Sequence, residues 1–276
     1  MRLRRGYIPC ALLVAAFLLA ACDQPTQEQP QRRPPLEVAR WDWVEWDYQH
    51  FRVSQAWEML GDELIRKSPQ IFIFGYHGNK TDIAIPSHVN GFPVTNIGQI
   101  ANNLTMGLYD SGIKRVTLPD TLLSIGAFAL GRNGLTEIRF PESVRTVGVY
   151  AFIENQLSEV VLPGGMRNVF PGAFAYNRIS NLVIYYGVEY ISRGAFRGNK
   201  LKNVVLPDSI HGIGWGAFAG NPLARISIGE GVELRFRGPP DSPPSFPNGF
   251  DDSYRENEKR AGTYTFDGET WTFESR

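Results

Sequence analysis

The sequence predicts a solenoid, in which short strands and turns wind into stacked coils of 22 residues each. Three observations indicate this fold class. Units of constant length begin at Ile113, Leu135, Leu157, Ile179, Leu201 and Leu223. Each unit repeats apolar residues at the same inner positions, and each of the five complete units carries asparagine near its end. Such units cannot bury their apolar face alone, so we expect them to stack around a shared core.

The order of positions within the unit predicts a strand followed by a return segment. Counting from the first residue of each unit, positions 4 and 6 are apolar throughout and share one face of the expected strand. Proline follows the strand in four units and ends it, because proline donates no ladder hydrogen bond. Positions 10, 13, 17 and 18 then point inward, with alanine at 17 and, in all but the first unit, phenylalanine at 18. The asparagine at position 21 suits a tight bend, where its amide can satisfy backbone groups of its own or the next coil.

The runs LTEIRFPESVRTVGVYAF (135–152) and LKNVVLPDSIHGIGWGAF (201–218) resemble the BspA-like, or Treponema-type, leucine-rich repeat. The stretch 81–98 is similar to the opening unit of that family. The resemblance implies a leucine-rich-repeat solenoid over residues 71–234, in a surface-exposed or secreted bacterial protein used in attachment and protein interaction. It brings no catalytic residues. The sequence departs from the family pattern at Phe170 and Ser192, which replace a glycine, and at Tyr185-Tyr186, which replace a proline-acid pair.

The first residues predict export and lipid anchoring. Residues 1–21 combine a basic start with an apolar run of 11 residues, as in a signal peptide, and this run is too short to span a bilayer. The run ends Leu19-Ala20-Ala21-Cys22, which resembles a bacterial lipobox and implies acylation of Cys22, for example with palmitate. A plain secretory signal with an incidental cysteine is the alternative. Residues 22–36, rich in glutamine and proline, are expected to form a flexible, lipid-anchored linker. The predicted location is the bacterial cell envelope, either at the outer membrane and cell surface or on the periplasmic face.

Composition and motifs argue against several function classes. Removing residues 1–21 leaves 25 basic against 28 acidic residues, a net charge of −3, which does not suggest nucleic acid as a partner. Beyond Cys22 that remainder has no cysteine, and the four histidines form no metal-binding motif. We find no nucleophile elbow, phosphate loop or paired carboxylates on a shared element. The sequence therefore predicts a protein that is not an enzyme and that needs no metal and no cofactor.

The segments that flank the repeats are interpreted as caps. Residues 37–70 contain Trp41, Trp43, Trp46, Tyr48 and Phe51, and a helix is expected to follow with Ser54 as its N-cap and with Val53, Trp57, Leu60 and Leu64 on one face. This N-terminal segment would cover the open end of the solenoid, with a membrane-interface or sugar-binding belt as the alternative. Residues 235–247 predict a proline-rich spacer.

Residues 248–276 are expected to form a helix and a hairpin. The helix is placed near Asp251–Arg260. In the hairpin, Asp267-Gly268 would form a two-residue type I′ turn, with Tyr264 facing Trp271. A C-terminal cap is our interpretation of this segment, with a separate binding tip as the alternative.

Two outward-facing sets are the candidate ligand-binding residues. Tyr185, Tyr186 and Tyr190 could form a platform for a sugar ring or a partner's side chain; alternatively, the rings lie flat in the room that glycines of neighbouring coils leave. Val161, Val183 and Val205 could form an apolar binding strip, or could simply be good strand formers. The predicted function is a protein-interaction or adhesion module, anchored in the membrane by its lipid and binding another protein or a glycan. The alternatives are a carbohydrate-binding surface protein and a structural envelope protein without a specific ligand.

Overall fold

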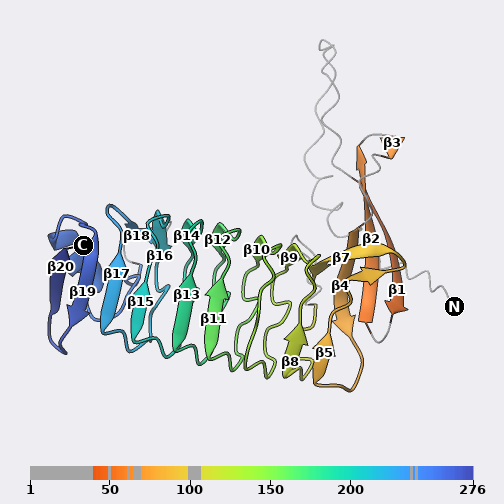
Figure 1. Ribbon diagram of the computed structural model, residues 1–276, viewed down its shortest axis with the longest axis horizontal. Helices are drawn as coiled ribbons and strands as arrows, with labels where there is room; N and C mark the ends of the chain where they lie inside the picture. The colour runs from red at the N-terminus through yellow and green to blue at the C-terminus, as the bar shows by residue number, and fades with distance from the viewer. Residues whose placement is uncertain are drawn as a thin grey trace, which may run out of the picture.

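The computed structural model is a row of stacked coils, with strands along two sides of the row (Figure 1). The structure describes residues 40–48, 51–60, 63–64, 70–98, 107–236, 239 and 242–275, and for 40–64 and Phe236 it describes the backbone only. The predicted signal peptide, the linker and Cys22 lie outside these residues. None of the helices among the described residues has the length and hydrophobicity that a membrane-spanning segment needs.

One side of the solenoid is a continuous sheet in the order β1-β2-β4-β7-β9-β10-β12-β14-β16-β18, with β3 on β2 and β6 on β7. From β4 onward the strands on this path pair in parallel, as expected when successive coils stack. The strands of this side are β1 (Arg40–Tyr48), β2 (Phe51–Leu60), β3 (Glu63–Leu64), β4 (Gln70–Tyr76), β6 (His88–Val89), β7 (Phe92–Ile97), β9 (Ser124–Ile125), β10 (Thr146–Val147), β12 (Asn168–Val169), β14 (Tyr190–Ile191), β16 (Gly212–Gly214) and β18 (Glu233–Phe236).

The other side carries the strand predicted at positions 3 to 6 of the repeat in every coil but the second, whose residues 137–140 form no strand. These strands lie in three shorter sheets: β5-β8, β11-β13 and β15-β17-β19-β20. Between coils of the repeat, its parallel pairs join residues 22 positions apart, such as Val161 and Val183, which confirms the register. The pair β5-β8, which joins the opening unit to the first coil, instead matches residues 33 positions apart, such as Asp82 and Arg115. Positions 4 and 6 are buried on this side while position 3 is exposed. Its strands are β5 (Asp82–Ala84), β8 (Arg115–Thr117), β11 (Glu159–Leu162), β13 (Asn181–Ile184), β15 (Asn203–Val205), β17 (Arg225–Ile228), β19 (Gly262–Phe266) and β20 (Trp271–Ser275).

A column of phenylalanine rings forms the centre of the core. Phe174 at position 18 is fully buried and lies between Phe152 and Phe196, with ring centroids 5.4 Å away on each side and the planes nearly parallel. Phe218 continues the column, 5.5 Å from Phe196. The alanine at position 17 is fully buried in every complete coil. These contacts confirm the inward assignment of positions 17 and 18.

The asparagines at position 21 connect each coil to the one before it. Asn177 Nδ2 donates to the carbonyl oxygen of Phe152 in the preceding coil, 2.9 Å away, and to that of Phe174 in its own coil, 3.2 Å away. Its Oδ1 accepts from the backbone N–H of Leu157, 3.1 Å away. Equivalent bonds recur at the other four asparagines. The prediction that these amides satisfy backbone groups is therefore confirmed, although the second coil they reach is the preceding one.

The helix predicted from Ser54 is wrong. Residues Phe51–Leu60 form strand β2, which pairs antiparallel with β1 on one side and with β4 on the other. The apolar residues of this short stretch fit a helical spacing, but hydrogen bonding to two neighbouring strands decides its conformation. Together β1 and β2 extend the continuous sheet beyond the first coil, at the N-terminal end of the row.

The segment predicted as a proline-rich spacer completes the last coil. The N–H of Phe218 donates to the carbonyl of Ser245 at 2.9 Å, and Phe246 stacks on Phe218 with 4.8 Å between ring centroids. Ser245 and Phe246 thus stand where the repeat has alanine and phenylalanine. The buried Asp251 accepts from the N–H groups of both residues at 2.8 and 3.1 Å, and burial raises the pKa of its carboxyl. Proline content alone did not predict this packing.

The helix expected in the C-terminal segment is confirmed as α2 (Phe250–Glu256), and the hairpin is present with a different turn. Tyr264 pairs with Phe273 rather than with Trp271, and four residues, 267–270, form the loop. A type I′ turn needs positive φ at both central residues, yet only Gly268 has it. Instead the Asp267 carboxylate accepts from the N–H groups of Glu269 and Thr270, both at 2.8 Å.

The hairpin closes the C-terminal end of the solenoid. Strand β19 pairs antiparallel with β17, and the fully buried Tyr264 packs its ring 5.2 Å from that of Phe250. Burial raises the pKa of Tyr264 to about 12. The segment thus covers the core of the last coil, as a C-terminal cap does.

Candidate functional site

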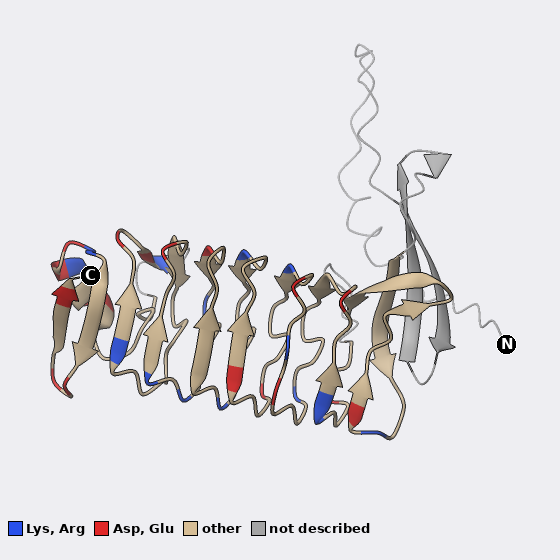
Figure 2. Cartoon of the chain, viewed as in Figure 1, with Lys and Arg blue, Asp and Glu red and all other residues tan. Residues whose placement is uncertain are grey.

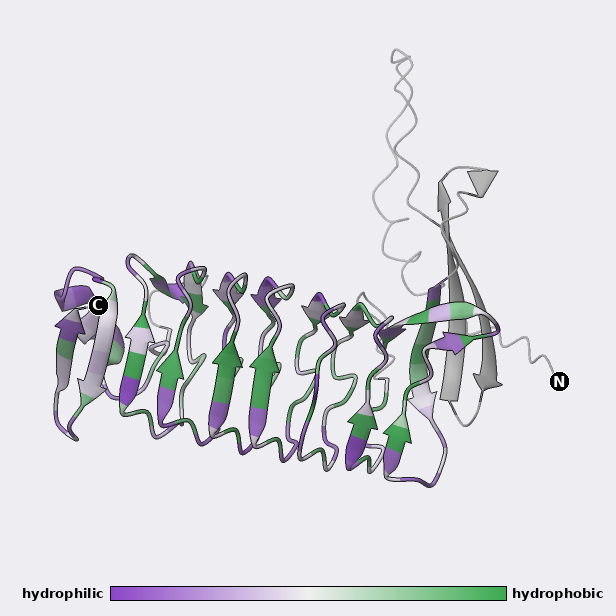
Figure 3. Cartoon of the chain, viewed as in Figure 1, coloured by the Kyte–Doolittle hydropathy of each residue, from purple (hydrophilic) through white to green (hydrophobic). Residues whose placement is uncertain are grey.

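One cluster of exposed apolar side chains lies on the side formed by β11, β13 and β15. Among the described residues, Tyr186 is 77% exposed, Val205 63% and Tyr185 53%. Val161 and Val183 are half-buried and pair across β11 and β13. We call these five residues the apolar patch. Figure 3 shows hydrophobic colour along these strands and hydrophilic colour where each begins.

The backbone explains why Tyr185 lies with the valines. Its N–H donates to the carbonyl of Leu162 at 3.1 Å, so the ladder between β11 and β13 continues to this residue. Because side chains alternate along a strand, Val183 and Tyr185 share the outward face. The structure thus places Tyr185 on the same face as the whole predicted valine strip, and the strongly exposed Tyr186 follows it at the turn.

Glycine in the neighbouring coil makes room for backbone here rather than for aromatic rings. A Cβ atom on Gly164 would collide with the carbonyl oxygen of Tyr186, and one on Gly187 would collide with that of Gly164. The two coils therefore approach closely at this turn. The Tyr186 ring, with most of its surface exposed, does not occupy the room beside Gly164.

Tyr190 belongs to a different surface from Tyr185 and Tyr186. It begins β14, in the continuous sheet on the other side of the solenoid, and its half-buried ring lies 6.1 Å from that of His211. The turn between them passes through Gly187, whose φ is 112°. The three tyrosines predicted as one platform are therefore divided between two surfaces.

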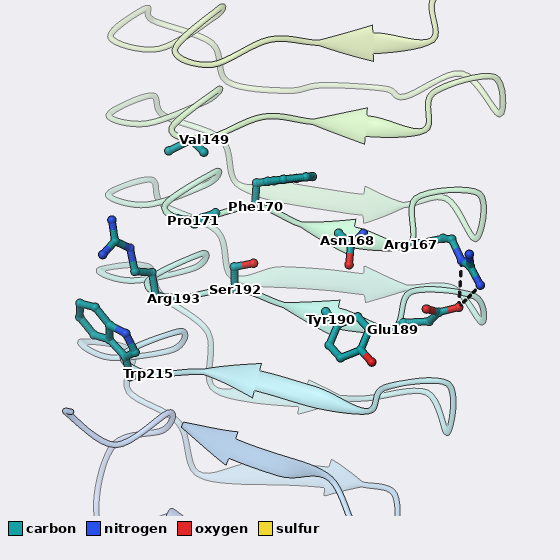
Figure 4. Close-up of a pocket in the computed structure, with 10 residues that line it drawn as sticks. All are labelled: Val149, Arg167, Asn168, Phe170, Pro171, Glu189, Tyr190, Ser192, Arg193 and Trp215. Atoms are coloured by element: carbon teal, nitrogen blue, oxygen red, sulfur yellow. Dashed lines mark hydrogen bonds and ion pairs between the residues drawn. The ribbon is translucent and has the colours of Figure 1, made fainter. Parts of the chain in front are cut away.

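A groove of about 650 Å³ crosses the outer face of β12, β14 and the coils beside them (Figure 4). Asn168, Arg167, Glu189 and Tyr190 stand at one end of it in the figure, and Val149, Pro171, Arg193 and Trp215 lie toward the other, with Phe170 and Ser192 between. We call this surface the aromatic groove. Its residues come from four consecutive coils.

Two departures from the repeat shape the aromatic groove. Position 14 is glycine in the first, second and fifth coils, where the backbone of the preceding coil comes close: a Cβ on Gly148 would lie 2.8 Å from the N atom of Ala127, and one on Gly214 would collide with that of Arg193. The third and fourth coils have Phe170 and Ser192 there instead. Both side chains line the groove, so the loss of glycine at position 14 marks the site.

Charged side chains at the groove are held by neighbours. At one end Arg167 and Glu189 form an ion pair of 2.7 Å. At the other, the guanidinium of Arg193 lies 5.4 Å from the ring centre of Trp215, in a cation–π contact. Each contact joins two side chains at the same position of adjacent coils, and so fixes the direction in which they point.

Charges elsewhere on the solenoid form weak ladders. Figure 2 shows Lys, Arg, Asp and Glu mainly at strand ends and turns. Arg115 bridges Asp82 and Glu137 at 3.1 and 3.3 Å, and Arg115 and Glu137 stand at the same position of adjacent coils. Because these groups are exposed, each pair contributes less than about 1 kcal/mol. Within the residues that the structure describes, no group of three or more His, Cys, Asp or Glu is placed to hold a metal ion.

Sequence reasoning missed most of the aromatic groove. It selected Tyr190 but not Trp215, Arg193, Arg167 or Glu189, and it noted Phe170 and Ser192 only as departures from a pattern. Two features of the sequence could have identified the groove. One is the replacement of glycine at position 14 by Phe170 and Ser192, and the other is Trp215 at position 15 of the fifth coil, where the first coil has Ala127.

The stacked coils and their asparagine ladder define a leucine-rich-repeat solenoid. Residues 106–230 match the family described as "BspA type Leucine rich repeat region" in six copies. The repeat region of this chain is therefore of the BspA type, as the resemblance in the sequence predicted.

One solved structure supports the fold. The chain is similar to the pneumococcal vaccine antigen PcpA, with 19% identity over 69% of this chain and 51% of that one and a TM-score of 0.54. A leucine-rich cell surface protein from Faecalibacterium prausnitzii A2-165 is 21% identical over 67% and 54% of the two chains, with a TM-score of 0.46. A leucine-rich-repeat protein from Bacteroides ovatus ATCC 8483 is 15% identical over 68% and 66%, with a TM-score of 0.30. The alignments thus span about half the length of the first two proteins, and no curated protein sequence matches.

Proposed function

We propose that this chain is a lipid-anchored cell-envelope protein that binds another protein through the apolar patch and acts by binding rather than by catalysis. One observation carries the proposal: of the five large apolar side chains that are exposed in the described residues, three belong to this patch. Scattered apolar residues are ordinary on protein surfaces, whereas a cluster with a polar border is typical of an interaction site.

The surroundings of the patch fit a protein partner. Glu159, Asn181 and Asn203 begin the three strands and are exposed, so they form a polar border along one edge. Tyrosine side chains combine a large contact area with few rotatable bonds, and they are frequent among the residues that dominate binding energy. The match to a BspA-type leucine-rich repeat region favours the same class of function.

We expect Tyr186→Ala to abolish most binding without affecting the fold. The side chain is exposed, so its removal should change the free energy of unfolding by less than about 0.5 kcal/mol. An aromatic anchor commonly contributes more than about 1 kcal/mol to binding, so attachment should fall at least about fivefold. The measurement is attachment of beads that carry the purified protein to surfaces coated with extracellular-matrix extract, alongside a thermal melt.

Arg139→Ala is the matched control, because Arg139 is an exposed residue at position 5 in the second coil, two coils before Tyr185 and Tyr186. Its removal should leave attachment unchanged. A well-folded Tyr186→Ala protein that attaches as well as the parent would contradict a contact through the patch. Unchanged attachment of cells that lack the whole protein would instead favour a structural envelope protein without a specific ligand.

Lipid anchoring at Cys22 is tested separately. The lipobox-like run and the glutamine- and proline-rich stretch that follows it support this part of the proposal. In cells that express Cys22→Ala, we expect the protein to move from the detergent phase to the aqueous phase of a phase separation, because it loses its acyl chains. Continued partitioning with membranes would show that another segment anchors the chain. Protease treatment of intact cells then distinguishes the cell surface from the periplasm.

A further inference from the structure

We propose that the aromatic groove is a carbohydrate site that binds a short oligosaccharide of pyranose rings. This site is separate from the apolar patch, because it lies on the other side of the solenoid and shares no residue with it. Its volume, about 650 Å³, falls within the range of roughly 300–1,000 Å³ that is usual for small-ligand sites.

The lining of the groove matches the two chemical aspects of a sugar ring. One face of a pyranose carries C–H groups, which pack on aromatic side chains, and its rim carries hydroxyl groups, which need donors and acceptors. Phe170, Tyr190 and Trp215 are half-buried and provide flat surfaces. Between and beside them stand the amide of Asn168 and the hydroxyl of Ser192.

The charged groups at the groove are held in place before any ligand arrives. Arg167 and Glu189 orient each other through their ion pair, and the backbone N–H of Glu189 donates to the carbonyl of Arg167 at 2.8 Å. An arginine has five N–H donors, so the pair still offers donors to a hydroxyl group. Arg193, held over Trp215, offers further donors at the other end of the groove. Such prior ordering lowers the entropy that binding must offset.

The geometry favours a sugar over a peptide. Extended peptides commonly bind by adding a strand to a free sheet edge, but β12, β14 and β16 are each paired on both sides. The aromatic residues of the groove are half-buried, whereas the apolar patch offers strongly exposed ones. A ligand that presents many hydroxyl groups and little apolar surface therefore suits the groove, and a protein partner suits the patch.

The repeat itself supplies variants that remove the site and keep the fold. Position 12 is glycine in the fifth coil, at Gly212, so Tyr190→Gly introduces a residue that this position already accepts. Position 15 is alanine in the first coil, at Ala127, so Trp215→Ala does the same. Thr146→Ala, at position 12 of the second coil, is the control, since Thr146 does not line the groove.

The experiment is isothermal titration calorimetry of the purified protein with cellotetraose, mannotetraose, tetra-N-acetylchitotetraose and tetragalacturonate. We expect at least one of them to bind with a Kd of about 1 mM or tighter. Tyr190→Gly and Trp215→Ala should each weaken that binding about tenfold or more, because aromatic anchors dominate such sites. Thr146→Ala should bind as the parent does, and so should Tyr186→Ala, which separates this site from the apolar patch.

Three results would overturn the proposal. One is the absence of binding to all four tetrasaccharides. Another is binding that survives both Tyr190→Gly and Trp215→Ala in proteins that melt cooperatively. The third is capture of an unglycosylated peptide from a random library that Tyr190→Gly abolishes, since this would assign the groove to protein recognition.

Discussion

Phe174→Ala is expected to lower the free energy of unfolding by about 3–5 kcal/mol, as for other buried large-to-small changes. The side chain is fully buried, and its ring stacks between those of Phe152 and Phe196, with 5.4 Å between ring centroids on each side. Removing it leaves a cavity in the middle of the column, and neither neighbouring ring can fill the cavity without leaving its own coil. Denaturant titration followed by circular dichroism measures the change.

Phe174→Leu is the matched control for this prediction. Leucine occupies the same position in the first coil as Leu130, where it is fully buried, so the repeat accommodates that shape. We expect it to cost less than about 1.5 kcal/mol. Lys200→Ala, at an exposed position, should change stability by no more than about 0.5 kcal/mol. Equal stability of Phe174→Ala and Lys200→Ala would contradict the packing of position 18 in the core.

Asn177→Ala is expected to cost roughly 2–3 kcal/mol, since a buried polar group left without a partner costs about 1–3 kcal/mol. The Leu157 N–H, which donates to Asn177 Oδ1, would lose this acceptor inside the core. The carbonyl oxygens of Phe152 and Phe174 would each lose one of two asparagine donors. These carbonyls are shared by asparagines of adjacent coils, so the change also weakens the link between coils.

Asn177→Asp separates the hydrogen bonds of this residue from its volume. The carboxylate could still accept the hydrogen bond from the Leu157 N–H. Its second oxygen, however, would face the two carbonyl oxygens that accept hydrogen bonds from Asn177 Nδ2 in the parent protein. Burial and this repulsion should raise the pKa of the new carboxyl in the folded state above its unfolded value of about 3.9. Between the two pKa values the folded state then binds more protons than the unfolded state. The contribution of this carboxyl to the free energy of unfolding is therefore fully present below its unfolded pKa, and it is lost as the pH rises through its folded pKa.

The stability of Asn177→Asp relative to the parent should therefore improve as the pH falls from 7 toward 4. Asn177→Ala should keep a constant difference from the parent over the same range, because it introduces no titrating group. Denaturation midpoints for the three proteins at several pH values test this expectation. A pH-independent difference for Asn177→Asp would show that the amide does not donate to the two carbonyls.

The repeated part of the fold could be predicted from sequence because its geometry depends on a fixed spacing. Residues 22 apart occupy the same place in adjacent coils, so the stacking of Phe152 on Phe174 and the pairing of Val161 with Val183 follow from counting. The flanking segments have no such spacing. Phe51–Leu60 became a strand because two partners were available, and the hairpin took a four-residue loop because the Asp267 carboxylate holds it.

The candidate sites were predictable only in part for the same reason. The valine strip and Tyr185 could be predicted because they face outward from equivalent or alternating positions of paired strands, and the apolar patch contains them all. Tyr190 was grouped with Tyr185 because the two are only five residues apart in the sequence. The turn at Gly187 sends the chain to the opposite side of the coil, so closeness in sequence did not mean a shared surface.

The sequence by itself determined the solenoid, its 22-residue coil, the inward positions and the asparagine column. Each of these features recurs in every coil, so the spacing of the residues alone predicts which side chains are buried. Only the tertiary structure decided which outward residues meet. The aromatic groove joins Tyr190 of one coil to Trp215 of the next and to Phe170 of the one before, across residues that are far apart along the chain. Their meeting depends on how closely neighbouring backbones approach at position 14, where glycine permits contact and a larger side chain stands out from the surface.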